Sequence, residues 1–303
     1  MDAAIIINPV AGSGRPRAGA RVELARNVLR QCGVDGQVCL TTRQGEAREY
    51  ARSFVERGVD TIVAWGGDGT VNEVASELAH RGSTLGIVPG GSGNGLAREL
   101  GLPLRDPARS LRVALQGEPR WIDAGELGGR FFFNVAGIGL DAQMAAVFNT
   151  LTARGLLRYL IVACREMLTY ESSFYILRAS DVAISQTALL VALANTRQYG
   201  NNAIIAPLAR LDDGLLDLVV LPPLTPLGAL WHARHLFTGT VHQVPGVKMQ
   251  TVRAVEIASD AMSWFHVDGE VFAASDTLSA KVHERALPVR CGGEEAGGDV
   301  REA

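Results

Sequence analysis

The sequence has little cysteine and no long apolar segment. Its 303 residues include four cysteines, and no two form the Cys-x-x-Cys pair of a zinc ribbon or thioredoxin-like site. The N-terminus lacks the basic region and apolar core of a signal peptide. The longest apolar candidate, 156–168, is interrupted by Arg158 and Arg165 and is shorter than the roughly 20 residues that span a bilayer. We therefore expect a cytoplasmic protein with reduced thiols, and peripheral membrane contact stays open.

An excess of positive charge is also missing. Lysine and arginine number 29 against 32 aspartate and glutamate, which gives a formal net charge of −3. A broad nucleic-acid-binding surface needs a basic excess, so we expect no nucleic acid partner. Apolar residues make up 47% of the chain, enough for a sizeable core, and glycine is abundant at 34 residues. These glycines have no Gly-X-Y period, which excludes collagen.

The first third of the chain alternates short apolar runs with amphipathic segments. The pattern predicts strands at 3–7, 38–40, 61–65 and 85–88, and helices at about 17–30, 46–57, 71–80 and 107–116. Strands that alternate with helices form a parallel sheet covered on both faces. In such sheets ligands bind at the carboxyl ends of the strands. We expect this α/β domain to occupy residues 1–122.

After residue 122 strand patterns predominate and fewer helices intervene. The clear helices are at 156–169 and 226–237, between strands such as 130–135, 174–179, 188–194, 215–221, 252–257 and 278–282. This pattern of strands with few helices indicates a mainly antiparallel, β-sandwich-like C-terminal domain at 123–287. The glycine- and glutamate-rich end, 288–303, is expected to be disordered.

Nine glycines fall on three turns that each follow a predicted strand and precede a helix. They are Gly12 and Gly14; Gly66, Gly67 and Gly69; and Gly90, Gly91, Gly93 and Gly95. Glycine lets the backbone approach a phosphate closely, and the following helix N-terminus attracts an anion. The three turns should converge at one edge of the sheet. Each turn alone is equally well a tight or flexible connection without a ligand.

The common phosphate-binding motifs are absent. No Gly-Lys pair occurs, which excludes a Walker A loop, and Gly12-Ser13-Gly14 lacks the third glycine of the dinucleotide fingerprint. The Asp-Phe-Gly and His-Arg-Asp elements of protein kinases are missing as well. If these loops bind phosphate, they do so as another kind of site.

The three loops, in this order, resemble the catalytic domain of the diacylglycerol kinase family, which includes sphingosine, ceramide and bacterial lipid kinases. The matching segments are NPVAGSG, GGDGTVNEV, PGGSGNGLA, FNVAGIGLDA, APLARLDDGLLD and VDGE. They extend over roughly residues 3 to 285. The resemblance implies a kinase that uses ATP and Mg²⁺ to phosphorylate a lipid hydroxyl. It leaves the lipid and the oligomeric state open, a homodimer included.

The resemblance also implies roles for individual residues. Glu270 matches the family's proton acceptor, and Asp68 is a second catalytic candidate that could reach a ribose, a metal or a proton. Magnesium would be held by the Asp213 carboxylate and the carbonyls of Arg210 and Leu215. The implied nucleotide-binding residues are Asn8, Pro9, Gly12, Arg15, Thr41, Gly66, Gly67, Asp68, Gly69, Thr70, Val71, Asn72, Ser92, Gly93 and Asn94. Thr42 is an alternative to Thr41.

The chemistry of these residue types is consistent with the implied roles. A carboxylate within reach of a hydroxyl can accept its proton, and a hard cation prefers carboxylate and carbonyl oxygens. Asp268-Gly269 is also a strong hairpin signal, so the segment with Glu270 has a purely structural reading. Asp123 is a weaker site candidate at the domain boundary, and His266 is expected to be structural.

Two positions depart from the family pattern. Gly95 stands where many bacterial diacylglycerol kinases have aspartate, which puts diacylglycerol in doubt as the acceptor, and Arg15 replaces a common lysine. Two other functions remain as alternatives. One is an NAD-kinase-like enzyme with a soluble acceptor, and the other is a non-catalytic regulator that binds lipid or nucleotide.

Overall fold

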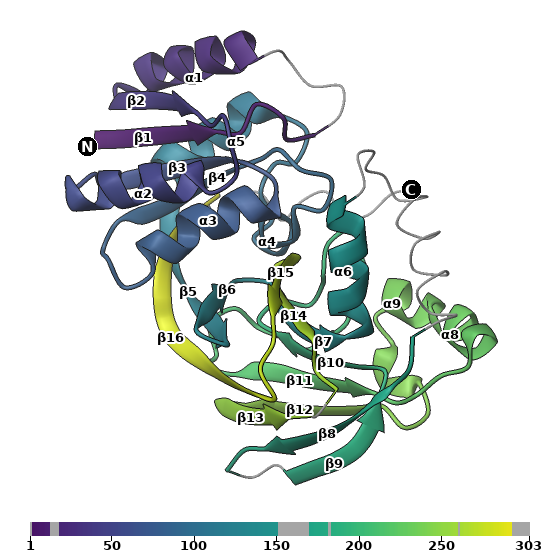
Figure 1. Ribbon diagram of the computed structural model, residues 1–303. Coiled ribbons are helices and arrows are strands. Elements are labelled where there is room, and N and C mark those ends of the chain that lie inside the picture. The colour runs from purple at the N-terminus through teal and green to yellow at the C-terminus, as the bar shows by residue number, and fades with distance from the viewer. Residues whose placement is uncertain (1, 13–17, 151–169, 181–182, 260, 293–303) are drawn as a thin grey trace. The chain divides into compact units, whose positions relative to one another are not determined.

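The computed structural model describes residues 2–12, 18–150, 170–180, 183–259 and 261–292 (Figure 1). Arg15 and the helix expected at 156–169 lie outside the described residues. The chain forms two compact units. The first contains the residues up to Ile122 together with those from Arg285 onward, and the second is Asp123–Glu284.

The first unit is built from alternating strands and helices. They are β1 Asp2–Ile7, α1 Ala18–Cys32, β2 Asp35–Leu40, α2 Glu46–Glu56, β3 Thr61–Gly66, α3 Asp68–Leu78, β4 Thr84–Pro89, α4 Gly95–Glu99 and α5 Pro107–Gln116. The strand order is β2-β1-β3-β4, and all of these pairs are parallel. This confirms the α/β class expected of the N-terminal region.

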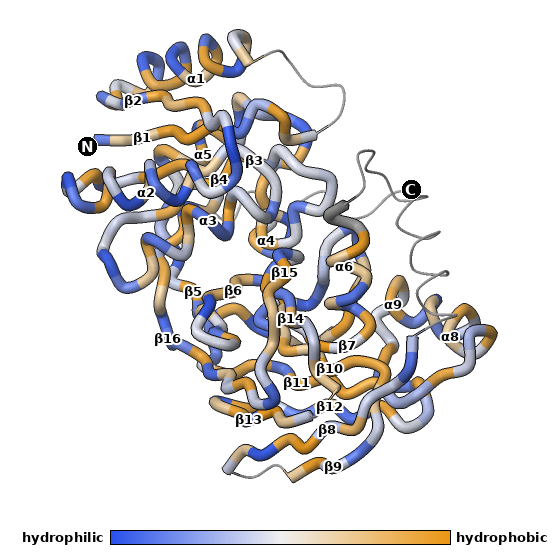
Figure 2. The backbone as a smooth tube through the Cα atoms, viewed as in Figure 1, coloured by the Kyte–Doolittle hydropathy of each residue, from blue (hydrophilic) through white to orange (hydrophobic). Residues whose placement is uncertain are grey.

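Both faces of this sheet are covered, because its central strands are apolar along their length (Figure 2). One face carries Ile5, Ile7 and Trp65, which pack against α1 and α5 in a single apolar cluster. The opposite face is covered by α2 and α3, which contact each other and strands β1 and β3. The carboxyl ends of adjacent strands are thereby fixed side by side, and the glycine loops follow them.

The second unit is mainly antiparallel. Its elements are β6 Arg130–Phe132, β7 Val135–Gly139, α6 Leu140–Thr150, β8 Ser173–Arg178, β9 Ala183–Ala188, β10 Leu190–Ala194, β11 Leu216–Leu221, α8 Pro226–His232, α9 Arg234–Thr238, the 3-10 helix η1 Val241–Gln243, β12 Lys248–Val252, β13 Ala254–Ala258, β14 Trp264–Val267 and β15 Glu270–Ala273. Two further strands, β5 Glu118–Leu127 and β16 Thr277–Cys291, cross the boundaries between the units.

The core of the second unit lies between two layers of strands. One layer is the antiparallel sheet β12-β11-β10-β7-β14-β15. The other contains β13, β8 and β9, together with β5, β6 and part of β16. Buried Phe132, Tyr175, Leu193, Ile257 and Phe265 come from both layers and form one apolar cluster. The β-sandwich-like C-terminal domain is therefore confirmed.

Several elements differ from the sequence-based expectation: α4, α6, β5, β9, β14 and β15 were not expected, and the helix expected at 226–237 is divided into α8 and α9. Two further differences concern boundaries. Helix α3 begins at Asp68, three residues before the expected Val71, so the Asp-Gly-Thr segment is helical rather than loop. An acidic residue in the first turn suits the helix dipole. Strand β16 continues past Pro288 to Cys291, although residues from 288 were expected to be disordered. Ala286, Leu287 and Val289 are fully buried, and Val289 pairs with Leu85 of β4.

Among the described residues, no helix is long and apolar enough to cross a membrane. Cys32, Cys39 and Cys291 are free thiols, and burial raises the pKa of each. Cys164 lies outside the described residues.

Candidate functional site

The second and third glycine loops pack directly against each other at the ends of β3 and β4. The Gly90 N–H donates to the Gly66 carbonyl over 2.5 Å. A Cβ on Gly91 would lie 2.7 Å from the Gly67 Cα, and one on Gly90 would lie 2.9 Å from the Gly66 backbone. These glycines therefore allow two backbones to touch. Close approach to phosphate is not needed to explain them.

Asp68 ties the same two loops together. Its Oδ1 accepts from the Gly95 N–H at 2.7 Å, and its Oδ2 accepts from the Asn94 N–H at 2.9 Å. A Cβ on Gly93 would lie 2.7 Å from that Oδ2. Asp68 thus caps the start of α4 from the first turn of α3. Both oxygens of this catalytic candidate have a structural partner, and a chemical role for it stays a prediction.

Asn94 shapes the tip of the third loop. It adopts a left-handed conformation with φ 51°, and its side-chain amide both accepts from the Gly91 N–H and donates to the Gly91 carbonyl. Arg98 donates from Nε to the Gly93 carbonyl at 2.9 Å. Ser92 is exposed at this tip, whereas Asn94 is buried. The loop is therefore held rigidly and leaves the Ser92 side chain in solvent.

The first loop joins this group through Asn8. The Asn8 side chain donates from Nδ2 to the Thr70 hydroxyl at 3.0 Å, and its Oδ1 accepts from the Val10 N–H. The Asn8 N–H donates to the Trp65 carbonyl at the end of β3. The structure thus brings the loops after β1, β3 and β4 into one cluster, which is the convergence that the sequence predicts.

Arg21 of α1 also belongs to the site, although the sequence motifs do not include it, because its side chain binds the first loop. Its guanidinium donates to the carbonyls of Asn8 at 2.8 Å and Ala11 at 2.9 Å, and the residue is only 1% exposed. Arg21 shares the buried face of α1 with Ala25, Val28 and Leu29. A charged residue at a position of apolar periodicity was the available signal, because a buried charge needs fixed partners.

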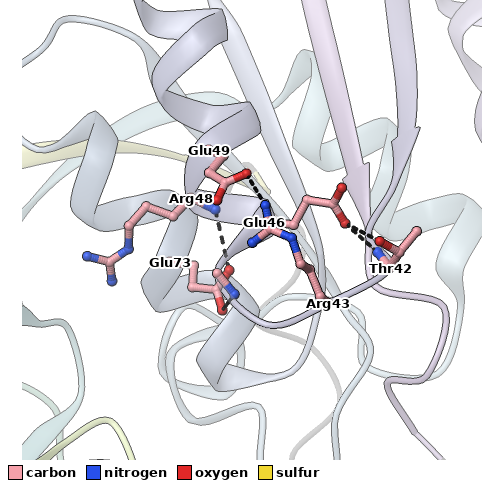
Figure 3. Close-up of polar contacts among 7 residues, drawn as sticks. Thr42, Arg43, Glu46, Arg48, Glu49 and Glu73 are labelled. Atoms are coloured by element: carbon pink, nitrogen blue, oxygen red, sulfur yellow. Dashed lines mark hydrogen bonds and ion pairs between the residues drawn. The ribbon is translucent and has the colours of Figure 1, made fainter.

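Thr41 and Thr42 differ in their surroundings. Thr41 is buried and donates its N–H to the Ile7 carbonyl, next to the first loop. Thr42 instead lies just before α2, where its N–H and hydroxyl both donate to the Glu46 carboxylate (Figure 3). That backbone hydrogen bond is the main reason why the pKa of Glu46 is lowered. Of the two threonines, Thr41 therefore remains the better nucleotide-binding candidate.

Other candidates lie on α3. Thr70, Val71 and Asn72 are buried, and the Asn72 side chain accepts from the Ser76 hydroxyl at 3.3 Å. Gly69 faces open space, since a Cβ there would have no neighbour within 4 Å. On the other side of α3, Glu73 accepts from the N–H groups of Gly45 and Arg48, which fixes the turn before α2 (Figure 3).

In the second unit, Glu270 follows a tight hairpin turn between β14 and β15. Asp268 and Gly269 form the turn with φ values of 48° and 84°, both left-handed. The Asp268 carboxylate accepts from the N–H groups of Phe133 and Asn134 at 2.9 Å and of Val135 at 3.2 Å. Asp-Gly is thus a hairpin signal, and its aspartate also anchors the turn to β7. Glu270 is half-buried opposite Val267.

His266 supports the same turn from inside. Its Nδ1 accepts from the Gly269 N–H at 3.4 Å, so Nε2 carries the proton and donates to Asp141 at 3.2 Å. Tyr199 donates to the same carboxylate oxygen. A Cβ on Gly137 would lie 1.9 Å from that oxygen, so Gly137 makes room for the pair. This arrangement gives His266 the structural role expected of it.

The loop proposed to hold magnesium is attached to Asp123. The Asp123 Oδ2 accepts from the Gly214 N–H at 2.7 Å, and its own N–H donates to the Leu211 carbonyl. Asp213 accepts from the Leu215 N–H at 3.1 Å. Burial, and then the charge of Asp213, raise the pKa of Asp217 to about 6. No cluster of three metal-ligating side chains occurs among the described residues.

The parallel α/β unit with its joined glycine loops and the antiparallel sandwich each match a known family. The family model for the diacylglycerol kinase catalytic domain matches residues 2–127, and the model for the YegS C-terminal NAD kinase beta sandwich-like domain matches residues 134–291. The chain therefore belongs to the diacylglycerol kinase catalytic-domain family with a YegS-type C-terminal domain, and it is a kinase.

Individual relatives agree. A Chromohalobacter salexigens protein named probable lipid kinase YegS-like is 33% identical, over 78% of this chain and 81% of its own. A Mycobacterium tuberculosis diacylglycerol kinase is 31% identical, over 71% of each chain. A diacylglycerol kinase structure from Bacillus anthracis shares the fold with a TM-score of 0.74 at 20% identity, over 96% of this chain and 97% of its own.

An NAD kinase structure from Archaeoglobus fulgidus in complex with ATP is also similar, with a TM-score of 0.57 at 14% identity. It covers 99% of this chain and 97% of its own. This likeness concerns the fold alone.

Proposed function

We propose that this protein transfers the γ-phosphoryl group of ATP to the hydroxyl of a lipid, with Mg²⁺ as cofactor. The observation that carries the proposal is the joined group of glycine loops in a chain whose relatives are named lipid kinases. Phosphoryl transfer depends mainly on positioning and charge neutralisation, so rigid loops with backbone N–H groups suit it.

The nucleotide is proposed to bind at the cluster formed by the loops after β1, β3 and β4. The exposed Ser92 tip, Gly69 at the start of α3 and Asn8 offer polar groups there. The N-terminus of α3 adds backbone N–H groups that point towards this cluster's end of the helix and a favourable dipole for phosphate. Asp68 and Arg21 serve this site by holding its loops in place.

Glu270 is proposed as the group that accepts the proton of the lipid hydroxyl. The hairpin turn fixes where Glu270 lies in the second unit, and Asp268 anchors that turn through three backbone hydrogen bonds. A half-buried carboxylate on a rigid turn loses little freedom when a hydroxyl binds to it.

The loop around Asp213 fits a hard cation. Its potential ligands are the Asp213 carboxylate and the carbonyls of Arg210 and Leu215, which are all oxygen donors. Burial is the main cause of the raised pKa of Asp217, and the nearby charge of Asp213 adds to it. A bound Mg²⁺ would supply positive charge that neutralises these carboxylates, and Asp123 would hold the loop through the Gly214 N–H.

One assay tests the proposal. The protein is incubated with labelled ATP, with and without Mg²⁺, and with diacylglycerol, sphingosine and ceramide in detergent, or with NAD. We expect Mg²⁺-dependent label in a lipid. Label in NADP alone would instead identify an NAD-kinase-like enzyme. ATP binding without any transfer would identify a regulator.

The variant Glu270→Gln tests the proposed base. It should lower kcat by 10²-fold or more while ATP binding is retained, because the amide cannot accept the proton. Glu256→Gln, on an exposed position of β13, is the matched control and should keep full turnover. Unchanged turnover in Glu270→Gln would remove Glu270 from the mechanism.

A further inference from the structure

Helices α8 and α9 expose a group of large apolar side chains. Of the nine large apolar residues that are exposed in the described part of the chain, four lie on these helices, Leu227, Leu230, Trp231 and Phe237, and a fifth, Leu208, lies in a loop that is hydrogen-bonded to α9. Scattered exposed apolar residues are normal on a soluble surface, but a concentration of them marks an interaction site. We call these five residues the α8–α9 patch.

The patch is presented on a fixed scaffold. Leu227, Leu230 and Trp231 are spaced i, i+3 and i+4 along α8, so they share one face, while Ala229 is buried on the other. Thr225 caps α8 by accepting from the Gly228 N–H, and Gly239 ends α9 with φ 67°. The loop before Leu208 is tied to α9 by the Ile204 N–H, which donates to the Leu236 carbonyl at 2.7 Å.

Charge in this segment has one sign. From 218 to 255 the sequence contains no aspartate or glutamate, whereas it contains Arg234, Lys248, Arg253 and three histidines. Arg253 pairs with Glu284 and is therefore already neutralised. Arg234 lies within the patch, where its guanidinium stands 4.0 Å from the centre of the Trp231 ring and donates to the Trp231 carbonyl. The exposed tryptophan thus carries a cation directly over its face.

We propose that the α8–α9 patch docks this protein onto a lipid bilayer that contains anionic headgroups. Tryptophan, leucine and phenylalanine insert at the boundary between headgroups and acyl chains, and adjacent arginine attracts anionic lipid. The absence of acidic residues from 218 to 255 favours a negatively charged partner. The inference rests on the proposed function only in that a lipid kinase must reach a substrate held in a membrane.

Vesicle co-sedimentation tests the proposal without requiring turnover. The full chain is mixed with vesicles of phosphatidylcholine alone, or of phosphatidylcholine with phosphatidylglycerol. Trp231→Ala and Phe237→Ala should each weaken binding about tenfold, because the apolar area that enters the bilayer is lost. Arg234→Gln should weaken binding about fivefold on the anionic vesicles only.

Matched controls come from the same unit. Phe174 on β8 is 50% exposed against 52% for Phe237, so Phe174→Ala removes an equally exposed ring outside the patch. Arg178→Gln removes an exposed cation from β8. Both controls should bind vesicles like the unaltered chain, and all variants are checked for an unchanged melting temperature.

Three results would overturn the inference. Equal binding by Phe237→Ala and Phe174→Ala would show that the patch does not contact lipid. A doubled mass by light scattering that Trp231→Ala reduces would make the patch an interface between two copies. Lipid phosphorylation without any vesicle binding would support the kinase proposal and contradict the proposal that the patch docks on a bilayer. Vesicle binding that the patch variants weaken, without phosphorylation of any lipid, would support docking and contradict the proposed function.

Discussion

Both units contain an Asp-Gly pair that sequence motifs single out, and in both the aspartate binds backbone amides. Asp68 accepts two N–H groups from the loop before α4, and Asp268 accepts three from the segment before and at the start of β7. The glycines differ. A Cβ would meet open space at both Gly69 and Gly269, but only Gly269 is needed for a left-handed backbone, with a φ of 84°. The same dipeptide therefore solves two different physical problems.

The largest effect should come from removing the anchoring carboxylates. Asp268→Ala should destabilise the protein by about 3 kcal/mol and Asp68→Ala by about 2 kcal/mol, because charged hydrogen bonds to backbone groups are lost. Thermal or denaturant unfolding measures both.

Asp276→Ala, at an exposed position, is the control and should stay within about 0.5 kcal/mol. If Asp268→Ala behaved like this control, the anchor would contribute nothing to stability.

Overpacking should distinguish a glycine that touches a neighbouring backbone from a glycine that faces open space. Gly91→Ala should cost about 2 kcal/mol, because its Cβ would lie 2.7 Å from the Gly67 Cα and neither backbone can yield easily. Gly69→Ala should be neutral or stabilising, since its Cβ meets open space in a helix. Denaturant midpoints of the two variants compare them directly, and equal losses would refute the packing account.

A smaller loss is expected at the hairpin turn. Gly269→Ala should cost about 1 kcal/mol, because alanine is strained at this positive φ although no atom obstructs its Cβ. Gly269→Asn should lose less, since asparagine tolerates the left-handed region. A larger loss in Gly269→Asn than in Gly269→Ala would mean that space, and not the backbone angle, limits this position.

The smallest effect concerns the exposed hydrogen bonds from Thr42 to the Glu46 carboxylate at the start of α2. The pKa of Glu46 is lowered in the folded state, first by the Thr42 N–H, so its contribution is complete above the unfolded-state pKa. It is lost as the pH falls through the lowered folded-state value. Protection of the Thr42 amide against hydrogen exchange, relative to its intrinsic rate at each pH, should therefore decrease at acidic pH. Glu46→Gln should remove most of that dependence, and an unchanged profile would show that this hydrogen bond contributes nothing.

Much of the fold could be predicted from the sequence, because apolar runs and helical periodicity are strong in the first unit. The strands at 3–7 and 61–65 and the helix at 107–116 appear at nearly the expected bounds. The predicted start of a helix was wrong where the local sequence signal was ambiguous. Asp68-Gly69 suggested a loop, yet the carboxylate is satisfied from α4 and the helix starts there.

The candidate site was predictable only in part. The convergence of the glycine loops follows from parallel strand order, which alternation alone indicates. The partners of Asp68, Asp123 and Asp268 could not be predicted, because each binds amides 26 to 135 residues away in the sequence. Arg21 was missed for a different reason: its partners are nearby backbone carbonyl groups, so its place on the apolar face of α1 was the available signal.

Strand β16 sets an order of events during synthesis. Its last part belongs to the first unit, where the Ala286 carbonyl accepts from His80, Arg290 donates to the Gly117 carbonyl and Val289 pairs with Leu85. A ribosome makes these residues only after the whole of the second unit has been synthesised. The edge of β4 therefore stays unpaired until then. The unit that is translated first is completed last.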